Sequence, residues 1–104
     1  MKGKCFETAM YLWLELAEKG KRPYMIHANI IIDGEPGAHA WVELDGYVFD
    51  YTQRDECKES FIENYYSQAQ IQRIVKYDAK ETLDKYLAYL NFGPWDNDWL
   101  IFKS

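Results

Sequence analysis

The segment that decides the fold reads Ala38-His39-Ala40-Trp41-Val42-Glu43-Leu44-Asp45-Gly46-Tyr47-Val48-Phe49-Asp50-Tyr51-Thr52. An Asp-Gly pair between apolar runs favours a two-residue turn that joins antiparallel strands. The segment therefore predicts a hairpin with strands over 38–44 and 47–51. In the register set by that turn, Trp41 pairs with Asp50. Because paired residues share a face, His39 and Asp50 become diagonal neighbours within hydrogen-bond reach.

A cysteine begins the first predicted helix, which covers residues 5–19. Apolar residues fill most of its circumference, as is typical of a helix buried against a sheet, and Gly20 and Pro23 end it. A helix N-terminus carries partial positive charge and free N–H groups, which favour a thiolate and could bind an oxyanion. We expect the helix to pack on the sheet face that carries His39, bringing the sulfur of Cys5 to the imidazole.

The remaining elements follow from turn residues and apolar spacing. In order, we expect a strand at 24–32, a loop at 33–37, the hairpin, a short helix at 58–66, a strand at 70–77 and a helix that begins at a capping box, Asp78 with Glu81. The apolar face of that helix carries Leu83, Tyr86, Leu87 and Leu90, and Gly93-Pro94 ends it. The tail is expected to pack on the core through Trp95, Trp99, Leu100 and Phe102. The pattern predicts one α+β domain over 1–104, with the N-terminal helix on an antiparallel sheet of three to five strands.

Composition narrows the classes of function. The chain has 104 residues, 48% of them hydrophobic, which suits one domain and is too short for two. Its net charge is −5 and its basic residues are scattered, so nucleic acid is not expected as a partner. No apolar run could cross a bilayer and the N-terminus has no signal-peptide pattern, so we expect no membrane association and a cytoplasmic location with free thiols. No CxxC or HxxxH spacing occurs, and we expect no metal or other cofactor.

Cys5, His39 and Asp50 have the residue types and order of a nucleophile, a base and a group that orients the base. Each alone has a structural interpretation, as a small buried cysteine, a satisfied strand histidine and a turn-forming aspartate. Their order and shared face favour a catalytic site. Cys57 lies in a charged stretch without a nearby histidine and is interpreted as a bystander, and Glu43 as a structural or solvated carboxylate.

At these residues the chain resembles the transglutaminase-like superfamily, papain-related enzymes with a cysteine on a helix and a histidine and aspartate on adjacent strands. The resemblance covers residues 3–52 and is carried by Cys5-Phe6-Glu7-Thr8-Ala9, the helix end at 14–20, Ala38-His39-Ala40-Trp41-Val42-Glu43 and Asp50-Tyr51-Thr52. The compact spacing is most similar to small bacterial proteases that remove leader peptides in lasso-peptide maturation. The resemblance implies a papain/transglutaminase-like core and a thioester formed on the cysteine. Residues 53–104 carry no motif that adds to it.

The chain departs from the family pattern before the cysteine. Papain-like enzymes usually place an oxyanion-hole side chain there, and Met1-Lys2-Gly3-Lys4 offers none. Asn29 and His27 are candidate donors, and a partner protein or a second copy of the chain could supply one instead. His27 is also an alternative base, ranked below His39 because it lacks an acidic partner at a predictable register. Trp41 either shields the His39–Asp50 pair from water or belongs to the core. We assign Trp41, His27 and Asn29 to the substrate-binding site.

The predicted function is a cysteine-dependent hydrolase or acyltransferase that acts on a peptide or amide through a thioester, and its partner is a peptide or protein substrate. The alternative is a binding module that keeps the fold, lacks turnover and holds a peptide in the groove between helix and sheet. The missing upstream donor favours the alternative.

Overall fold

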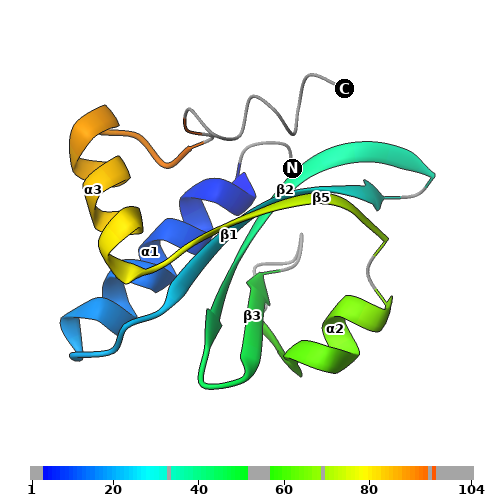
Figure 1. Ribbon diagram of the computed structural model, residues 1–104, viewed down its shortest axis with the longest axis horizontal. Helices are drawn as coiled ribbons and strands as arrows, with labels where there is room; N and C mark the ends of the chain where they lie inside the picture. The colour runs from blue at the N-terminus through cyan, green and yellow to red at the C-terminus, as the bar shows by residue number, and fades with distance from the viewer. Residues whose placement is uncertain (1–3, 33, 52–56, 69, 94, 96–104) are drawn as a thin grey trace.

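The computed structural model describes residues 4–32, 34–51, 57–68, 70–93 and 95 (Figure 1). The elements are α1 (Lys4–Glu18), β1 (Tyr24–Ile32), β2 (Glu35–Leu44), β3 (Tyr47–Tyr51), β4 (Cys57–Phe61), α2 (Ile62–Gln68), β5 (Ile71–Tyr77) and α3 (Ala79–Tyr89). The five strands form one antiparallel sheet in the order β4-β3-β2-β1-β5. The predicted α+β architecture, with an N-terminal helix on an antiparallel sheet and a C-terminal helix, is confirmed.

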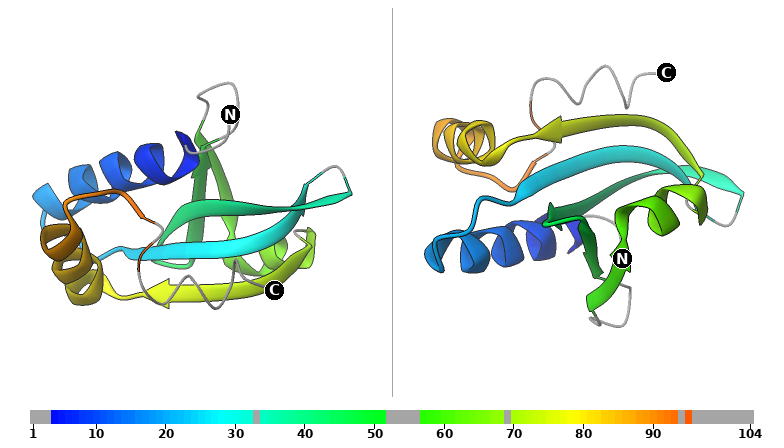
Figure 2. Two further views of the ribbon diagram at one scale, coloured as in Figure 1. Left: turned by 90° about the horizontal axis from the view of Figure 1, so that it is seen from above. Right: turned by 60° about the horizontal axis from the view of Figure 1, so that its bottom comes forward.

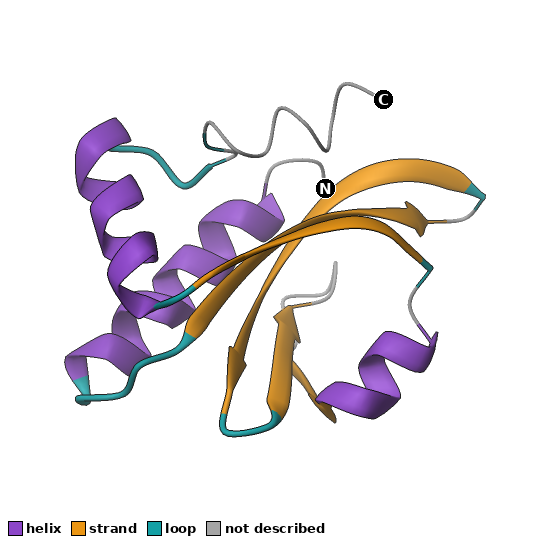
Figure 3. Ribbon diagram, in the orientation of Figure 1, coloured by secondary structure: helices purple, strands orange, loops and turns teal. Residues whose placement is uncertain are grey.

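The helices lie on both sides of the sheet (Figures 2 and 3). Side chains of α1 and α3 join the core on one face, and α2 packs on the other. Alternation along the strands separates the two interiors: Met25 and Val42 point to α1, whereas Ile26 and Trp41 point to α2. Among the described residues, none of the helices combines the length and apolar character needed to cross a membrane.

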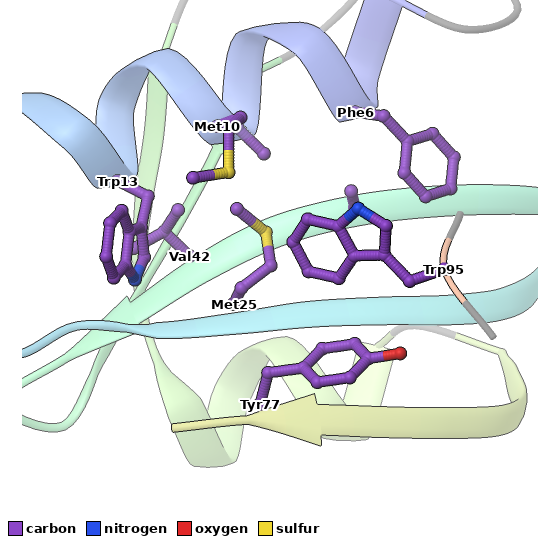
Figure 4. Close-up of a cluster of buried hydrophobic side chains, with 9 residues drawn as sticks. Phe6, Met10, Trp13, Met25, Val42, Tyr77 and Trp95 are labelled. Carbon is purple, nitrogen blue, oxygen red and sulfur yellow. The ribbon is translucent and has the colours of Figure 1, made fainter. Parts of the chain in front are cut away.

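The core beneath α1 is built from large apolar side chains (Figure 4). Phe6, Met10 and Trp13 of α1 are at most 5% exposed, and they form one cluster with residues of β1, β2 and β5 and with Trp95. The Trp13 indole donates a 2.9 Å hydrogen bond to the Pro23 carbonyl, which ties the end of the helix to the start of β1. The predicted packing of Trp95 on the core is confirmed, and the rest of the tail, from 96 to 104, lies outside the described residues.

The β2–β3 hairpin has the predicted two-residue turn. Asp45 and Gly46 both have positive φ, 53° and 84°, and Leu44 pairs with Tyr47 across them. The described ladder continues as far as Val42 opposite Phe49, and the predicted pair of Trp41 with Asp50 is not among its described pairs. The turn also anchors α2, because the Gly46 carbonyl accepts a 3.0 Å hydrogen bond from the N–H of Ile62.

The loop predicted at 33–37 is wrong in its second half, because β2 already begins at Glu35. Pro36 pairs with Ile31, although proline lacks the N–H that a strand donates. The N–H of Ile31 points away from β2 and donates to the Gln70 carbonyl at 2.9 Å, so the Pro36 nitrogen also faces outward. No ladder bond is lost there, and the strand runs through the proline.

The helix predicted at 58–66 is also only half right. Its first part is the strand β4, in which Ser60 pairs with Val48 and Phe61 with Tyr47, and only its second part belongs to α2. The Phe61 and Tyr47 rings stack with centroids 4.9 Å apart. Pairing with the open edge of β3 therefore overrides the local helical preference.

The capping box of α3 is confirmed, with the Asp78 side chain accepting from the N–H of Glu81 at 2.8 Å and the Glu81 side chain accepting from that of Asp78 at 3.2 Å. Its predicted apolar face is confirmed at Tyr86, which packs on the core, and is wrong at its three leucines. The exposed fractions are 42% for Leu83, 58% for Leu87 and 79% for Leu90, whereas Thr82 is fully buried. Ala79 also packs on the core. It ends at Leu90 in a left-handed conformation rather than at Gly93-Pro94.

Candidate active site

Cys5 lies in the first turn of α1, as the second residue of the helix. Its side chain is a free, partly buried thiol, and Sγ lies 3.9 Å from the Ala38 carbonyl of β2, to which it donates a weak hydrogen bond. The first N–H groups of a helix have no partner within it, so the backbone around the sulfur presents donors and partial positive charge.

His39 and Asp50 make the hydrogen bond predicted from the hairpin register. His39 Nε2 lies 2.8 Å from Asp50 Oδ1, and the two side chains are only 16% and 14% exposed. The bond leaves Nδ1 as the ring nitrogen that can face a second partner. The pair is sheltered from bulk water and remains reachable at its edge.

The predicted packing of α1 on the face that carries His39 is wrong. The helix covers the opposite face, where Ala40 and Val42 belong to its core. Cys5 nevertheless reaches the imidazole, because α1 contacts both β2 and β3 and its first turn lies next to β2, where Cys5 Sγ is 3.9 Å from the Ala38 carbonyl (Figure 2). Ala38 directly precedes His39, so the thiol lies beside the backbone of the strand that carries the imidazole.

His39 is hydrogen-bonded to Asp50, and Cys5 lies close enough to the imidazole to affect the pKa of His39. Burial by itself lowers the pKa of His39, but hydrogen bonds with Asp50 and with Cys5, and the negative charges of these two groups, raise that pKa to about 9. The ring is therefore positively charged at neutral pH. An imidazolium beside a sulfur favours the thiolate, which is the nucleophilic form.

Asp50 has a further hydrogen bond, from a residue of α2. Tyr65 Oη donates to Asp50 Oδ2 at 2.8 Å, so the two carboxylate oxygens bind one donor each. The Tyr65 ring packs on Trp41 with centroids 5.0 Å apart. Burial and the charge of Asp50 raise the pKa of Tyr65, so its hydroxyl keeps its proton at neutral pH.

Glu43 is the centre of a second polar cluster on the same face. Its side chain is 1% exposed, and Oε2 accepts from Trp41 Nε1 at 3.0 Å and from the hydroxyl of Tyr66. Lys76 Nζ of β5 lies 2.8 Å from Oε1. Of the two interpretations of Glu43, the structure supports the structural one and excludes a solvated carboxylate. Burial and the charged Glu43 raise the pKa of Tyr66.

The structure buries the three residues assigned to substrate binding. Trp41 and His27 have no exposed area, so neither can touch a substrate directly. The expectation that these two side chains contact the substrate is therefore corrected. Trp41 lies beside the His39 ring, at 5.9 Å between centroids, and lines the polar cluster. His27 lies on the α1 face among Phe6 and Trp95, at 4.7 and 4.9 Å, which also removes it as an alternative base.

Asn29 is 8% exposed and pairs with Ala38, the residue whose carbonyl contacts the thiol. It stays a candidate donor near the sulfur. Cys57 was interpreted as a bystander, and its side chain lies outside the described residues.

Tyr65 and Tyr66 were missed by sequence reasoning. They lie 15 and 23 residues from the carboxylates that they bind, in a part of the chain without a motif. The only local signal is a pair of adjacent tyrosines in a short helix, because neighbouring helical side chains point about 100° apart and can reach two partners.

Comparisons with protein-family models, with curated proteins and with solved structures found no match. Across the described part of the chain, no group of three or more His, Cys, Asp or Glu side chains could hold a metal ion.

Proposed function

We propose that this protein is a cysteine-dependent hydrolase or acyltransferase that acts on a peptide or amide. One observation carries the proposal: His39 is hydrogen-bonded to Asp50, and its imidazole interacts with Cys5 at the N-terminal end of a helix. A nucleophile, a base and a group that orients the base need this connectivity for acyl transfer.

In the acylation step the Cys5 thiolate attacks the substrate carbonyl and forms a C–S bond. The C–N bond then breaks, and the protonated His39 gives its proton to the leaving amine. The product is a thioester on Cys5 and a neutral imidazole. A histidine that is charged at neutral pH is the acid that this step needs.

In the second step the neutral His39 takes a proton from water or from an acceptor amine. The resulting nucleophile attacks the thioester carbonyl, the C–S bond breaks and the sulfur leaves as a thiolate. Acylation removes the thiolate charge, which is one of the causes that raise the pKa of His39. The same ring is therefore neutral, and able to accept a proton, in a larger fraction of molecules in the thioester state than in the free enzyme.

Charge on the substrate oxygen needs donors. The N–H groups in the first turn of α1, where Cys5 lies, have no acceptor within the helix and could bind it. Asn29, in register with Ala38, supplies a side chain on the α1 side of the sheet. These donors replace the side chain that related enzymes place upstream of the cysteine.

The proposal includes a papain/transglutaminase-like core, with similarity to the small bacterial leader-peptide proteases. Helix α1, the His39 strand and the Asp50 strand occur in the order of that superfamily. We also propose a cytoplasmic location, because a free nucleophilic thiol such as Cys5 persists in a reducing compartment.

The second candidate is a peptide-binding module without turnover. The burial of Trp41 and His27 favours it, because it leaves fewer side chains to contact a substrate or stabilise an oxyanion. A module of this kind would keep the hydrogen-bonded triad and form no thioester.

Iodoacetamide labelling with mass mapping tests the nucleophile. We expect Cys5 to be alkylated at pH 6 while Cys57 is not, and we expect His39→Ala to slow the labelling of Cys5 by about tenfold or more. Cys57→Ala is the matched control, and it should leave the labelling of Cys5 unchanged. Equal rates at both cysteines, rising only near the ordinary thiol pKa of about 8.5, would contradict the proposal.

Turnover is tested with a library of fluorogenic peptide amides, with and without hydroxylamine as a competing nucleophile. Cys5→Ala should abolish product without unfolding the domain, His39→Ala should do nearly as much damage, and Asp50→Asn should leave partial activity. The double variant Cys5→Ala with His39→Ala should be hardly worse than Cys5→Ala alone. A reactive Cys5 that forms no hydroxamate from any peptide would support the binding module.

A further inference from the structure

Tyr65 of α2 contacts Asp50 but takes no part in the proposed reaction steps. Its hydroxyl donates to Asp50 Oδ2 at 2.8 Å, while Asp50 Oδ1 faces His39 Nε2 at 2.8 Å. A carboxylate with one bonded oxygen can rotate about its terminal bond, whereas a carboxylate with both oxygens bonded is fixed. Asp50 therefore has its orientation set from the side opposite the imidazole.

The position of the Tyr65 hydroxyl is itself determined by packing. The Tyr65 ring lies against Trp41, which is fully buried, with centroids 5.0 Å apart. The first residue of α2, Ile62, is anchored to the β2–β3 turn by its backbone N–H. The donor thus stands on a helix that is fixed to the hairpin that carries the histidine and the aspartate.

The next residue provides an internal comparison. Tyr66 is on the same helix, also packs on Trp41 at 6.3 Å, and donates to Glu43 rather than to Asp50. The two adjacent tyrosines therefore both pack on Trp41 but bind different carboxylates. Only Asp50, the carboxylate that Tyr65 binds, contacts the imidazole of His39.

We propose that Tyr65 is a positioning residue of the catalytic site, which acts through Asp50 by holding this carboxylate on the imidazole of His39. The inference rests on the proposed function, since it names a fourth member of the same site. Within the described part of the chain, the ionisable groups that act on the imidazole are Cys5 from α1, Asp50 from β3 and, through Asp50, Tyr65 from α2. Burial raises the pKa of Tyr65, so its hydroxyl is a donor at every pH that the test uses.

The test compares Tyr65→Phe with Tyr66→Phe in the full chain. Two readouts are recorded: the NMR titration of the His39 ring, and the rate at which iodoacetamide labels Cys5 between pH 5.5 and 9. Tyr65→Phe should lower the titration midpoint of His39 below its wild-type value and slow the labelling of Cys5 at neutral pH by about tenfold, as expected for one hydrogen bond to a charged group. Tyr66→Phe should leave both readouts at the wild-type level.

The same substitution in the Asp50→Asn background separates positioning from a general structural effect. Because Tyr65 acts through Asp50, Tyr65→Phe should add nothing to Asp50→Asn in either readout. Wild-type behaviour of Tyr65→Phe, an equal effect of Tyr66→Phe, or full additivity with Asp50→Asn would each overturn the inference.

A different result would contradict the proposed function. If His39→Ala leaves the labelling of Cys5 unchanged, the cysteine and the histidine do not act together, whatever Tyr65 does. The NMR titration still reports on the Tyr65–Asp50–His39 contacts in that case. The effect of His39 on the labelling of Cys5 and the effect of Tyr65 on that labelling are therefore measured in separate variants.

Discussion

On the α1 side of the sheet the interior is mainly apolar and includes the buried His27, whereas on the α2 side it holds the hydrogen-bonded groups of the candidate site, which are His39, two carboxylates and two tyrosines. The first interior is built from residues such as Met10, Trp13 and Val42, which are at most 3% exposed. The second joins Asp50 and Glu43 to hydroxyl and indole donors. One sheet thus separates a face that supplies hydrophobic stabilisation from a face that fixes polar groups in place.

The difference shows how so small a domain can hold ionisable groups without unfolding. Burying apolar area stabilises a fold roughly in proportion to the area, at about 25 cal/mol per Å². A buried polar group stabilises little by itself and costs free energy if its partner is removed. We therefore expect substitutions on the α1 side to change stability, and substitutions on the α2 side to change titration and reactivity.

The largest expected effect is on the apolar side. Trp13→Ala removes a side chain that is 3% exposed and should lower the free energy of unfolding by about 3 to 5 kcal/mol. Glu15→Ala, on the exposed side of the same helix, removes only an ion pair with Lys19 and should change it by less than about 0.5 kcal/mol. Urea unfolding measures both, and similar losses in the two variants would contradict the division between the faces.

A smaller loss of folding free energy is expected at Gly93, where the α1 side has no room for one added methyl group. A Cβ added at Gly93 would lie 2.5 Å from His27 Cε1, at a φ of 100°, and Gly93→Ala should cost about 3 kcal/mol. Gly46 has a similar φ of 84° but no atom within 4 Å of such a Cβ, so Gly46→Ala should cost about 1 kcal/mol. Thermal unfolding of the two variants separates the clash from the backbone strain, and equal losses would argue against close packing at His27.

The titration of His39 on the α2 side should make the free energy of unfolding depend on pH. The pKa of His39 is about 9 in the folded protein against 6.5 for the free side chain, so its contribution is complete below pH 6.5 and is lost as the pH rises through 9. Between these values the loss should reach about 2 to 3 kcal/mol. Asp50→Asn removes the main cause of the raised pKa, so the difference between its urea-unfolding curves and those of the wild type isolates His39. A difference that stays constant, or grows, from pH 6.5 to 9 would contradict the ion pair.

The smallest effect is expected outside both faces. Asp78→Ala removes the exposed N-cap of α3 and should cost about 1 kcal/mol while leaving the labelling of Cys5 by iodoacetamide at the wild-type rate. Helix content by circular dichroism and the labelling rate check the two halves of this expectation. A changed labelling rate would mean that α3 is coupled to the site.

The candidate site could be predicted from the sequence to the extent that local rules govern it. The Asp45-Gly46 turn sets the hairpin register, and that register predicts that His39 and Asp50 lie within hydrogen-bond reach, as they do. The helix that begins near Cys5 follows from its apolar pattern and its ending at Gly20. The capping box at Asp78 and Glu81 is equally local, because both partners lie within one helical turn.

Features that depend on distant partners could not be predicted in the same way. The spacing of Leu83, Tyr86, Leu87 and Leu90 marks an apolar side of α3, but how the helix docks decides which of them meet the core, and only Tyr86 does, beside the buried Thr82. Likewise β4 exists because β3 offers an open edge. The face on which α1 packs follows from the whole sheet.

The hairpin that carries His39 and Asp50 could be predicted from the chain, because turn geometry and strand alternation act over a few residues. The bonds from Tyr65 to Asp50 and from Tyr66 to Glu43 could not, and they became visible only in the folded molecule. A hydroxyl that finds a carboxylate 15 or 23 residues away leaves no periodicity in the chain. Such contacts arise when a helix docks on a sheet, after local preferences have already been satisfied.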